Sequence, residues 1–231
     1  MLFDKSKCIC LDRKVDSPRL YYSRFAISPL LSGQASILGN SIRKILLGEI
    51  QGTSVTCVTF TDIVNEYSNF PGIRESVHDI LLNIRDIVLI GNTGKLQKGS
   101  IIFKGPGIIT AKHIQLPSFV TLVDKTQHIA HVETNTEIKI DLVIEKGRGW
   151  QVQKDSSIIG STFLIDAQFT PVKHVNYSIY SLGEGTVLQE LLMLEIWTNG
   201  ALTPEEALIK ACENISMLLE PILSIKKNKF S

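Results

Sequence analysis

Two histidines and a glutamate stand close together near the middle of the chain, as His128, His131 and Glu133. On a helix, histidines at this spacing could turn both imidazole rings toward one metal ion, which would make the chain a metal-dependent enzyme. Ile129, Val132 and the nearby threonines favour a strand instead, and residues three apart in a strand point to opposite faces. We therefore expect strand histidines, and a metal site at His128 and His131 is the alternative that metal analysis of the purified chain would test.

Other motifs of catalysis and ligand binding are weak. The turn Gly105-Pro106-Gly107 is not followed by the Lys-Ser/Thr pair of a phosphate-binding loop. The segment Lys146–Trp150, with the sequence KGRGW, puts cations beside an aromatic ring that could contact a nucleotide or RNA. Its position after a strong strand favours a turn instead, with the arginine able to pair elsewhere. We expect no catalytic residue, no cofactor site and no metal site in this chain.

Charge and cysteine content limit the function further. The chain of 231 residues has 24 basic and 23 acidic side chains and a net charge of +1, so it lacks the basic surplus of a protein that grips phosphates. The cysteines Cys8, Cys10, Cys57 and Cys212 form no CxxC pair, which favours a reducing compartment. No apolar run reaches the roughly 18 residues of a membrane span, and the start lacks a signal-peptide core. We expect a soluble protein that works in the compartment where it is made.

Three helices are predicted, and two of them are long. The first covers Gln34–Leu47, where one arc is apolar and Leu47 lies on the opposite side, so this helix has two faces to bury. The second is predicted over Arg74–Leu89. The third runs from Thr203 to Ile222, with Thr203 as N-cap, Pro204 as first residue and Glu206 closing a capping box.

Strands fill most of the remaining sequence, which makes the fold class α+β. The third helix also carries a continuous apolar stripe, and together with the two-faced first helix it indicates a dimerising or partner-binding scaffold. The predicted strands lie in residues 1–32, Val55–Phe60, Glu137–Glu145, Phe163–Phe169, Val172–Tyr180 and Leu188–Thr198, and a polar loop is predicted over Lys154–Ser161.

Four segments occur in the order found in one family. Gly33–Leu47, with the sequence GQASILGNSIRKILL, resembles the T-L-G-N-A-L-R-R-I-L-L helix of bacterial and plastid RNA polymerase α subunits. Asn65–Val88 resembles the family's H-E-Y-S…G…E-I-L-L-N-L segment, and Lys146–Trp150 resembles R-G-R-G-Y. Glu195–Ala207 resembles E-x-x-T-N-G…P-E-E-A. The resemblance covers nearly the whole chain.

The resemblance implies the fold of a bacterial-type RNA polymerase α amino-terminal domain. Residues 1–50 plus 163–231 would form a discontinuous dimerisation domain, and residues 51–162 an inserted, strand-rich domain. The implied function is a homodimer on which the β and β′ subunits (β′ and β″ in plastids) assemble into a DNA-directed RNA polymerase, a nucleotidyltransferase. The active centre, with its Mg²⁺ and the expected Zn²⁺, would lie in the large subunits, and DNA would be contacted only through the assembly. The alternative is a polymerase-independent dimeric interaction module of the same fold.

The resemblance also implies two sets of interface residues. Arg43, Lys44, Leu47 and Arg85 correspond to positions that meet a large subunit. Lys44 stands where the family has an arginine, so this contact keeps its charge but loses bidentate pairing. The positions that correspond to the dimer core are Leu38, Ile42, Ile45, Leu208, Ile215 and Leu219.

Several departures and local features refine these expectations. Asn65 replaces a histidine and Phe70-Pro71 replaces polar residues, so we expect the tip of the inserted domain to differ from the family. The sequence ends at Ser231, where the family continues into a DNA-binding C-terminal domain, and we expect that domain and its promoter contacts to be missing. The motif at Glu195–Gly200 resembles plastid versions, which predicts the plastid stroma or nucleoid as the location, with a bacterial cytoplasm as the alternative.

Overall fold

The computed structural model describes residues 6–61, 65, 67–91, 96–151, 161–183 and 189–224. The chain divides into two compact units, here called the terminal unit (Met1–Ile50 and Thr170–Ser231) and the central unit (Gln51–Phe169). The expected second boundary, between residues 162 and 163, is wrong, because residues 163–169 belong to the central unit. Two short strands in this segment pair with strands of that unit, which a local sequence pattern does not reveal.

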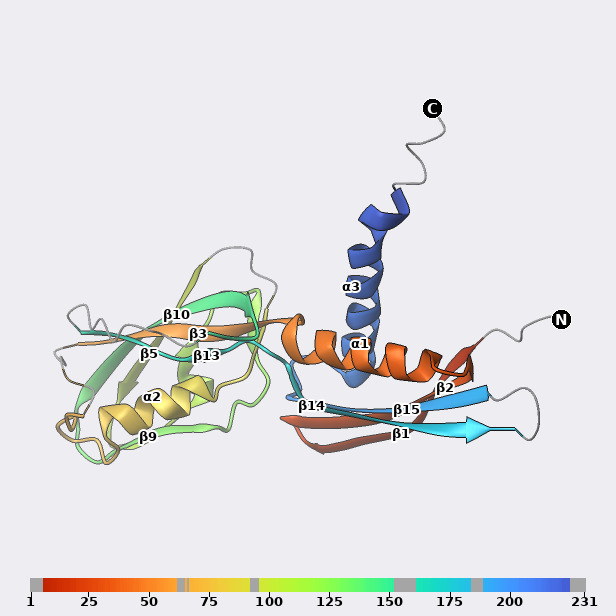
Figure 1. Ribbon diagram of the computed structural model, residues 1–231. Coiled ribbons are helices and arrows are strands. Elements are labelled where there is room, and N and C mark those ends of the chain that lie inside the picture. The colour runs from red at the N-terminus through yellow and green to blue at the C-terminus, as the bar shows by residue number, and fades with distance from the viewer. Residues whose placement is uncertain are drawn as a thin grey trace. The chain divides into compact units, whose positions relative to one another are not determined.

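A four-stranded antiparallel sheet forms the base of the terminal unit. Its order is β1-β2-β15-β14, so both ends of the chain contribute adjacent strands. Helix α1 (Gln34–Gly48) lies along one face of this sheet and contacts β14, β15 and β2 (Figure 1). The strands are β1 (Lys7–Ser17), β2 (Leu20–Leu31), β14 (Val172–Leu182) and β15 (Gln189–Thr198).

The start of α1 depends on a residue distant in the sequence. The helix begins after Gly33, which has a φ of 83° and provides no side chain to cap the helix. The carboxylate of Glu190 in β15 replaces the cap, because it accepts hydrogen bonds from the backbone N–H groups of Gly33 (2.8 Å) and Ala35 (3.1 Å). The predicted helix over Gln34–Leu47 is confirmed, and a strand residue holds its first turn.

Helix α3 (Pro204–Ser224) starts as the sequence predicts. The backbone N–H of Thr203 donates to the Glu206 carboxylate (3.0 Å), and the backbone N–H of Glu206 donates to the Thr203 hydroxyl (3.3 Å). The first turns of α3 pack beside α1, and the rest of the helix extends away from the sheet (Figure 1). Only the beginning of α3 therefore packs against the rest of the terminal unit.

The central unit is built on a larger antiparallel sheet. Its main sheet has the order β7-β5-β10-β3-β4-β8, and β12 pairs with β3 at the side. The long strand β10 alternates buried and exposed residues, as predicted for Glu137–Glu145. Two smaller pairs, β11 with β13 and β6 with β9, complete the strand content.

The elements of the central unit follow in chain order: β3 (Gln51–Phe60), α2 (Val77–Arg85), β4 (Leu89–Gly91), β5 (Gln97–Lys104), β6 (Gly107–Thr110), η1 (Ala111–His113), β7 (Ile114–Gln115), β8 (Val120–Leu122), β9 (His128–Val132), β10 (Glu137–Arg148), β11 (Trp150–Gln151), β12 (Thr162–Leu164) and β13 (Ala167–Gln168).

Helix α2 is shorter than the predicted Arg74–Leu89. It begins after Ser76, whose hydroxyl accepts a hydrogen bond from the backbone N–H of Asp79 in a capping box. It ends at Arg85, and Leu89 already belongs to strand β4. The apolar residues after Arg85 fit a helix and a buried strand equally well, because both bury a continuous apolar run.

Two further expectations are corrected or lie outside the structure. The single strand predicted over Phe163–Phe169 is two short strands, β12 and β13. The loop predicted over Lys154–Ser161 lies outside the described residues, except for Ser161. Among the helices of the described chain, none has the length and apolar character needed to cross a membrane.

Candidate protein-interaction surfaces

The outward face of α1 carries the residues expected to meet a large subunit. Arg43 and Lys44 are exposed, and Leu47 keeps 37% of its surface exposed. Ile42, Ile45 and Leu46 point the other way and are buried. This division follows from the helical repeat of 3.6 residues, which places residues 43, 44 and 47 in the half of the helix opposite the core. The outward face combines two cations with an apolar side chain.

Arg85, the fourth residue expected to contact a large subunit, belongs to the central unit. It is the last residue of α2 and is partly exposed. Its Nε lies 3.4 Å from Oδ1 of the neighbouring Asp86. An exposed pair of this kind contributes little stability, so the guanidinium can exchange this partner for another carboxylate at low cost.

The residues expected to form the dimer core do not share one face. Ile42, Ile45 and Leu208 pack in the core of the terminal unit itself and keep at most 8% of their surface exposed, and their place in a dimer core stays a prediction. Leu38 and Ile215 are half-buried against the same core. Of the six, only Leu219 is exposed. Apolar periodicity identifies a face that is buried, but it does not say whether the chain's own sheet or a partner covers it.

The second half of α3 is the main exposed apolar surface of the terminal unit. The core residues of the helix are Pro204, Ala207, Leu208 and Ala211, all in its first turns. From Leu218 onward the apolar stripe continues with large side chains that are between 50% and 72% exposed. We call this surface the open stripe of α3: Leu218, Leu219, Ile222 and Leu223. A row of exposed leucine and isoleucine of this kind is typical of a helix that packs against a partner.

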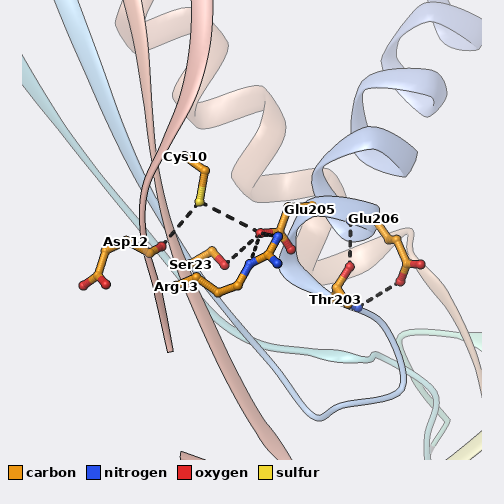
Figure 2. Close-up of polar contacts among 7 residues, drawn as sticks. All are labelled: Cys10, Asp12, Arg13, Ser23, Thr203, Glu205 and Glu206. Carbon is orange, nitrogen blue, oxygen red and sulfur yellow. Dashed lines mark hydrogen bonds and ion pairs between the residues drawn. The ribbon is translucent and has the colours of Figure 1, made fainter. Parts of the chain in front are cut away.

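Glu205, in the first turn of α3, fixes the helix to the sheet (Figure 2). Its Oε1 accepts hydrogen bonds from Nε of Arg13 in β1 (2.8 Å) and from the hydroxyl of Ser23 in β2 (3.3 Å). The thiol of Cys10 lies 3.9 Å from the same oxygen. Burial alone would raise the pKa of Glu205, but the hydrogen bonds, chiefly from Arg13, lower it below its usual value. The direction in which α3 leaves the sheet therefore depends on one ionised carboxylate.

Sequence reasoning identified Glu205 only as part of a motif. Thr203, Pro204 and Glu206 explain the start of the helix, while Glu205 has no local partner and bonds to strands nearly 200 positions away in the chain. The signal that could have identified it is the second acidic residue in the first turn, because one glutamate is enough to complete a capping box.

The segment before α3 positions its start. Thr198 donates its hydroxyl to the carbonyl of Leu202 (2.7 Å), and the side chain of Asn199 accepts from the backbone N–H of Ala201 (3.0 Å). Gly200 has a φ of 86°, which favours glycine. The Thr-Asn-Gly sequence is thus a turn that connects β15 to α3.

A second carboxylate, that of Glu195, is held by two side chains of the adjacent strand. Glu195 in β15 accepts from Nε of Arg24 (3.0 Å) and from the hydroxyl of Tyr22 (2.9 Å) in β2. The hydrogen bonds from Arg24 lower the pKa of Glu195, against the opposing effect of burial. Trp197 packs against Tyr22 in a tilted arrangement, with ring centres 4.9 Å apart. These contacts brace the two central strands of the sheet.

The turn predicted over Lys146–Trp150 is mostly strand: residues 146–148 belong to β10 and pair with β3, and only Gly149 separates β10 from β11. A Cβ atom at Gly147 would lie 2.7 Å from the ring of Phe169, so only glycine fits there without a shift. Gly149 has a φ of 65°, and its carbonyl accepts from the backbone N–H of Phe169 (2.9 Å). Trp150 is 66% exposed. The glycines therefore serve packing of the central unit.

His128 and His131 lie in strand β9, as predicted. Both bond to Glu75, whose Oε1 is 2.9 Å from Nε2 of His128 and whose Oε2 accepts from the backbone N–H of His131 (2.7 Å). Only one imidazole ring takes part, and this contact joins the start of α2 to β9. Across the described ranges, no three His, Cys, Asp or Glu side chains gather as metal ligands.

Comparison with known proteins identifies the class of the central unit. Residues 50–170 match the family described as the RNA polymerase Rpb3/RpoA insert domain. This match covers more than half of the chain, and its limits coincide closely with those of the central unit.

Three curated relatives extend the similarity to nearly the whole chain. DNA-directed RNA polymerase subunit alpha of Zygnema circumcarinatum is 45% identical over 96% of this chain and 62% of the relative. The subunits of the same name from Phaseolus angularis and Glycine max are 48% and 47% identical over 96% of this chain and 67% of each relative. The chain belongs to the family of DNA-directed RNA polymerase α subunits. It spans about two thirds of the length of these relatives.

Proposed function

We propose that this chain forms a homodimer that serves as the assembly platform of a multisubunit DNA-directed RNA polymerase. The large subunits that assemble on it would be β and β′, which in plastids are β′ and β″. The family membership and the names of the relatives support this proposal. The observation that carries it is the open stripe of α3, which presents large apolar side chains to solvent at the end of a helix anchored by Glu205.

The dimer interface is proposed to centre on the second half of α3. Burying the open stripe removes several large apolar side chains from water, which is the main driving force of association. A second copy of the chain carries the same stripe, so a two-fold arrangement covers both surfaces at once. Leu219 lies within this surface, Ile215 lies one turn before it on the same helix, and Leu38, Ile42, Ile45 and Leu208 are proposed to join the dimer core beside it.

The outward face of α1 is proposed as the contact with a large subunit. Arg43 and Lys44 would pair with acidic groups of that subunit, and Leu47 would provide the apolar centre of the contact. Lys44 makes a point-charge contact instead of a bidentate one. Arg85 would supply a further cation from the central unit.

Catalysis, metal ions and DNA binding are assigned to the rest of the assembly. The chain would be a non-catalytic subunit of a nucleotidyltransferase, with Mg²⁺ and Zn²⁺ bound by the large subunits. Its net charge of +1 fits a protein that meets DNA only through the assembled polymerase. The plant and algal sources of its relatives support the plastid, at the stroma or nucleoid, as its location.

The test is capture of large subunits by chains that differ at one exposed apolar residue of α1. We expect Leu47→Asp to reduce recovery of the large subunits at least tenfold in co-expression and affinity purification, while the variant still dimerises. The matched control is Val15→Asp, because Val15 is 60% exposed in strand β1 of the same unit and lies outside the α1 face. Equal capture by both variants would contradict the assignment of the α1 face. Recovery of the unsubstituted chain only as a dimer would indicate a polymerase-independent interaction module.

A further inference from the structure

Three of the four cysteines lie where strand β1 meets helix α3. Cys8 and Cys10 belong to β1, and Cys212 belongs to α3. Cys8 and Cys212 both line one groove, together with Leu208 and Ile209. Two thiols more than 200 positions apart in the chain are thus brought together on two different elements.

The register of the two elements indicates which thiols face each other. Cys10 lies beside Glu205 in the first turn of α3 (Figure 2). Cys8, two residues earlier in β1, points to the same side of the strand and lies about 6.6 Å farther along it. Cys212, seven residues after Glu205, points to the same side of the helix and lies about 10.5 Å farther along it. Both Cys8 and Cys212 line the groove, while Cys10 lies beside Glu205.

We propose that Cys8 and Cys212 form a reversible intrachain disulfide that fastens α3 to the edge of the sheet. The oxidant class is a peroxide. One thiolate attacks a peroxide oxygen, so that an S–O bond forms, the O–O bond breaks and hydroxide leaves. The second thiolate attacks the resulting sulfenic sulfur, the S–S bond forms and a second hydroxide leaves. The two protons released by the thiols complete two water molecules, and the two electrons pass from sulfur to the peroxide.

The surroundings of the pair favour closure of this bond. A disulfide needs Cα atoms within about 7 Å of each other. Cys212 is exposed and directly follows Ala211, the last buried residue of α3, so its thiol lies at the edge of the packed turns and is accessible to a peroxide. The link would fix the angle at which the open stripe of α3 leaves the sheet. Because it forms within one chain, it does not depend on the proposed homodimer.

The rate of closure should rise with pH. Burial, together with the nearby thiols of Cys212 and Cys10, raises the pKa of Cys8 above its ordinary value of 9.0, and burial beside Glu213 raises the pKa of Cys212. Thiolates are the reacting species, so few are present at neutral pH. Between pH 7 and pH 9 the thiolate fraction, and with it the rate, should increase on the order of tenfold per pH unit.

The experiment is oxidation of the purified full chain with hydrogen peroxide, followed by non-reducing tryptic mapping by mass spectrometry. Cys8 and Cys10 share one tryptic peptide, so the Cys10→Ser variant assigns the linked sulfur. We expect a peptide pair containing Cys8 and Cys212 in the unsubstituted chain and in Cys10→Ser, but not in Cys8→Ser or Cys212→Ser. Dithiothreitol should release the pair. The link should also raise the midpoint of thermal unfolding of the terminal unit by about 5 to 10 °C, because it closes a very long loop.

Other outcomes would overturn the proposal. They are a link between two chains, a link that persists in Cys8→Ser, and loss of thiols to sulfinic acid without any disulfide. Formation of the same peptide pair at the same rate in a denaturant would also contradict it, because the fold would then play no part in bringing the thiols together. Cys57→Ser is the matched control, since Cys57 lies in the central unit and should leave the result unchanged.

Discussion

Removing part of one side chain from the open stripe of α3 should weaken the homodimer by a predictable amount. The change is Leu219→Ala. Leu219 is 50% exposed and lies outside the core residues of the terminal unit. Alanine keeps the helix and adds no charge, so any loss reports the apolar contact with the partner and not the folding of the chain.

The size of the effect follows from the surface that the dimer would cover. Fully burying a leucine side chain contributes about 1.5–3 kcal/mol, and half of the Leu219 surface is already covered, so each copy would gain about 0.8–1.5 kcal/mol on dimerisation. A two-fold interface contains the residue twice, which doubles the loss to about 1.5–3 kcal/mol. Since 1.4 kcal/mol is a factor of ten, the dissociation constant should rise about 10- to 100-fold.

The assay is sedimentation equilibrium over a series of concentrations, with circular dichroism to show that the variants are folded. The control is Met217→Ala. Met217 is 65% exposed, and two residues on a helix are separated by about 200°, so it points away from the open stripe. The reasoning would be refuted by an unchanged dissociation constant for Leu219→Ala, or by an equal loss for both variants.

Three further changes test contacts that stabilise each unit by itself. Glu190→Ala should reduce the free energy of unfolding of the terminal unit by about 1–2 kcal/mol in urea titrations, because the start of α1 loses its only carboxylate acceptor among the described contacts. Glu205 has a lowered pKa, so its ion pair with Arg13 stabilises the fold above pH 4.5 and is lost as the pH falls below that value; stability measured from pH 6 to 3 should drop there, and Arg13→Gln should flatten the drop. Gly147→Ala should cost the central unit about 1–3 kcal/mol in thermal or urea unfolding, because the new methyl group meets the Phe169 ring.

Each of these predictions has a direct control or a contradicting result. Glu213→Ala removes an exposed carboxylate from α3 and should change stability little, so an equal loss there would show that the Glu190 effect is not a capping effect. A pH profile that is the same with and without Arg13 would contradict the role of its pair with Glu205. Full stability of Gly147→Ala would mean that Phe169 moves aside freely.

The local structure of α1 and α3 could be predicted because it depends on neighbours in the sequence. The start of α3 follows from its capping residues, and the division of α1 into a buried and an exposed half follows from helical periodicity. The end of α2 could not be predicted, because Leu89 continues the same apolar run in a strand. The segment 163–169 was assigned to the wrong unit since its pairing with β3 and β11 is a contact between distant residues.

For the interaction surfaces, the exposure of side chains on α1 could be predicted from the sequence, but the long-range anchors of the helices could not. Arg43, Lys44 and Leu47 are exposed as helical geometry requires. Ile42 and Leu208 are buried in the core of their own unit, and their place in a dimer core stays a prediction, because an apolar periodicity does not identify what covers it. Glu190 and Glu205, which position the two helices, were missed as anchors because their partners lie on other strands.

The proposed platform function is tested most directly by affinity purification of the tagged chain from its native source, with native mass spectrometry of what is recovered. We predict an assembly that contains two copies of this chain together with β-type and β′-type RNA polymerase subunits. A strictly monomeric chain, recovered with no large polymerase subunit, would contradict the proposal.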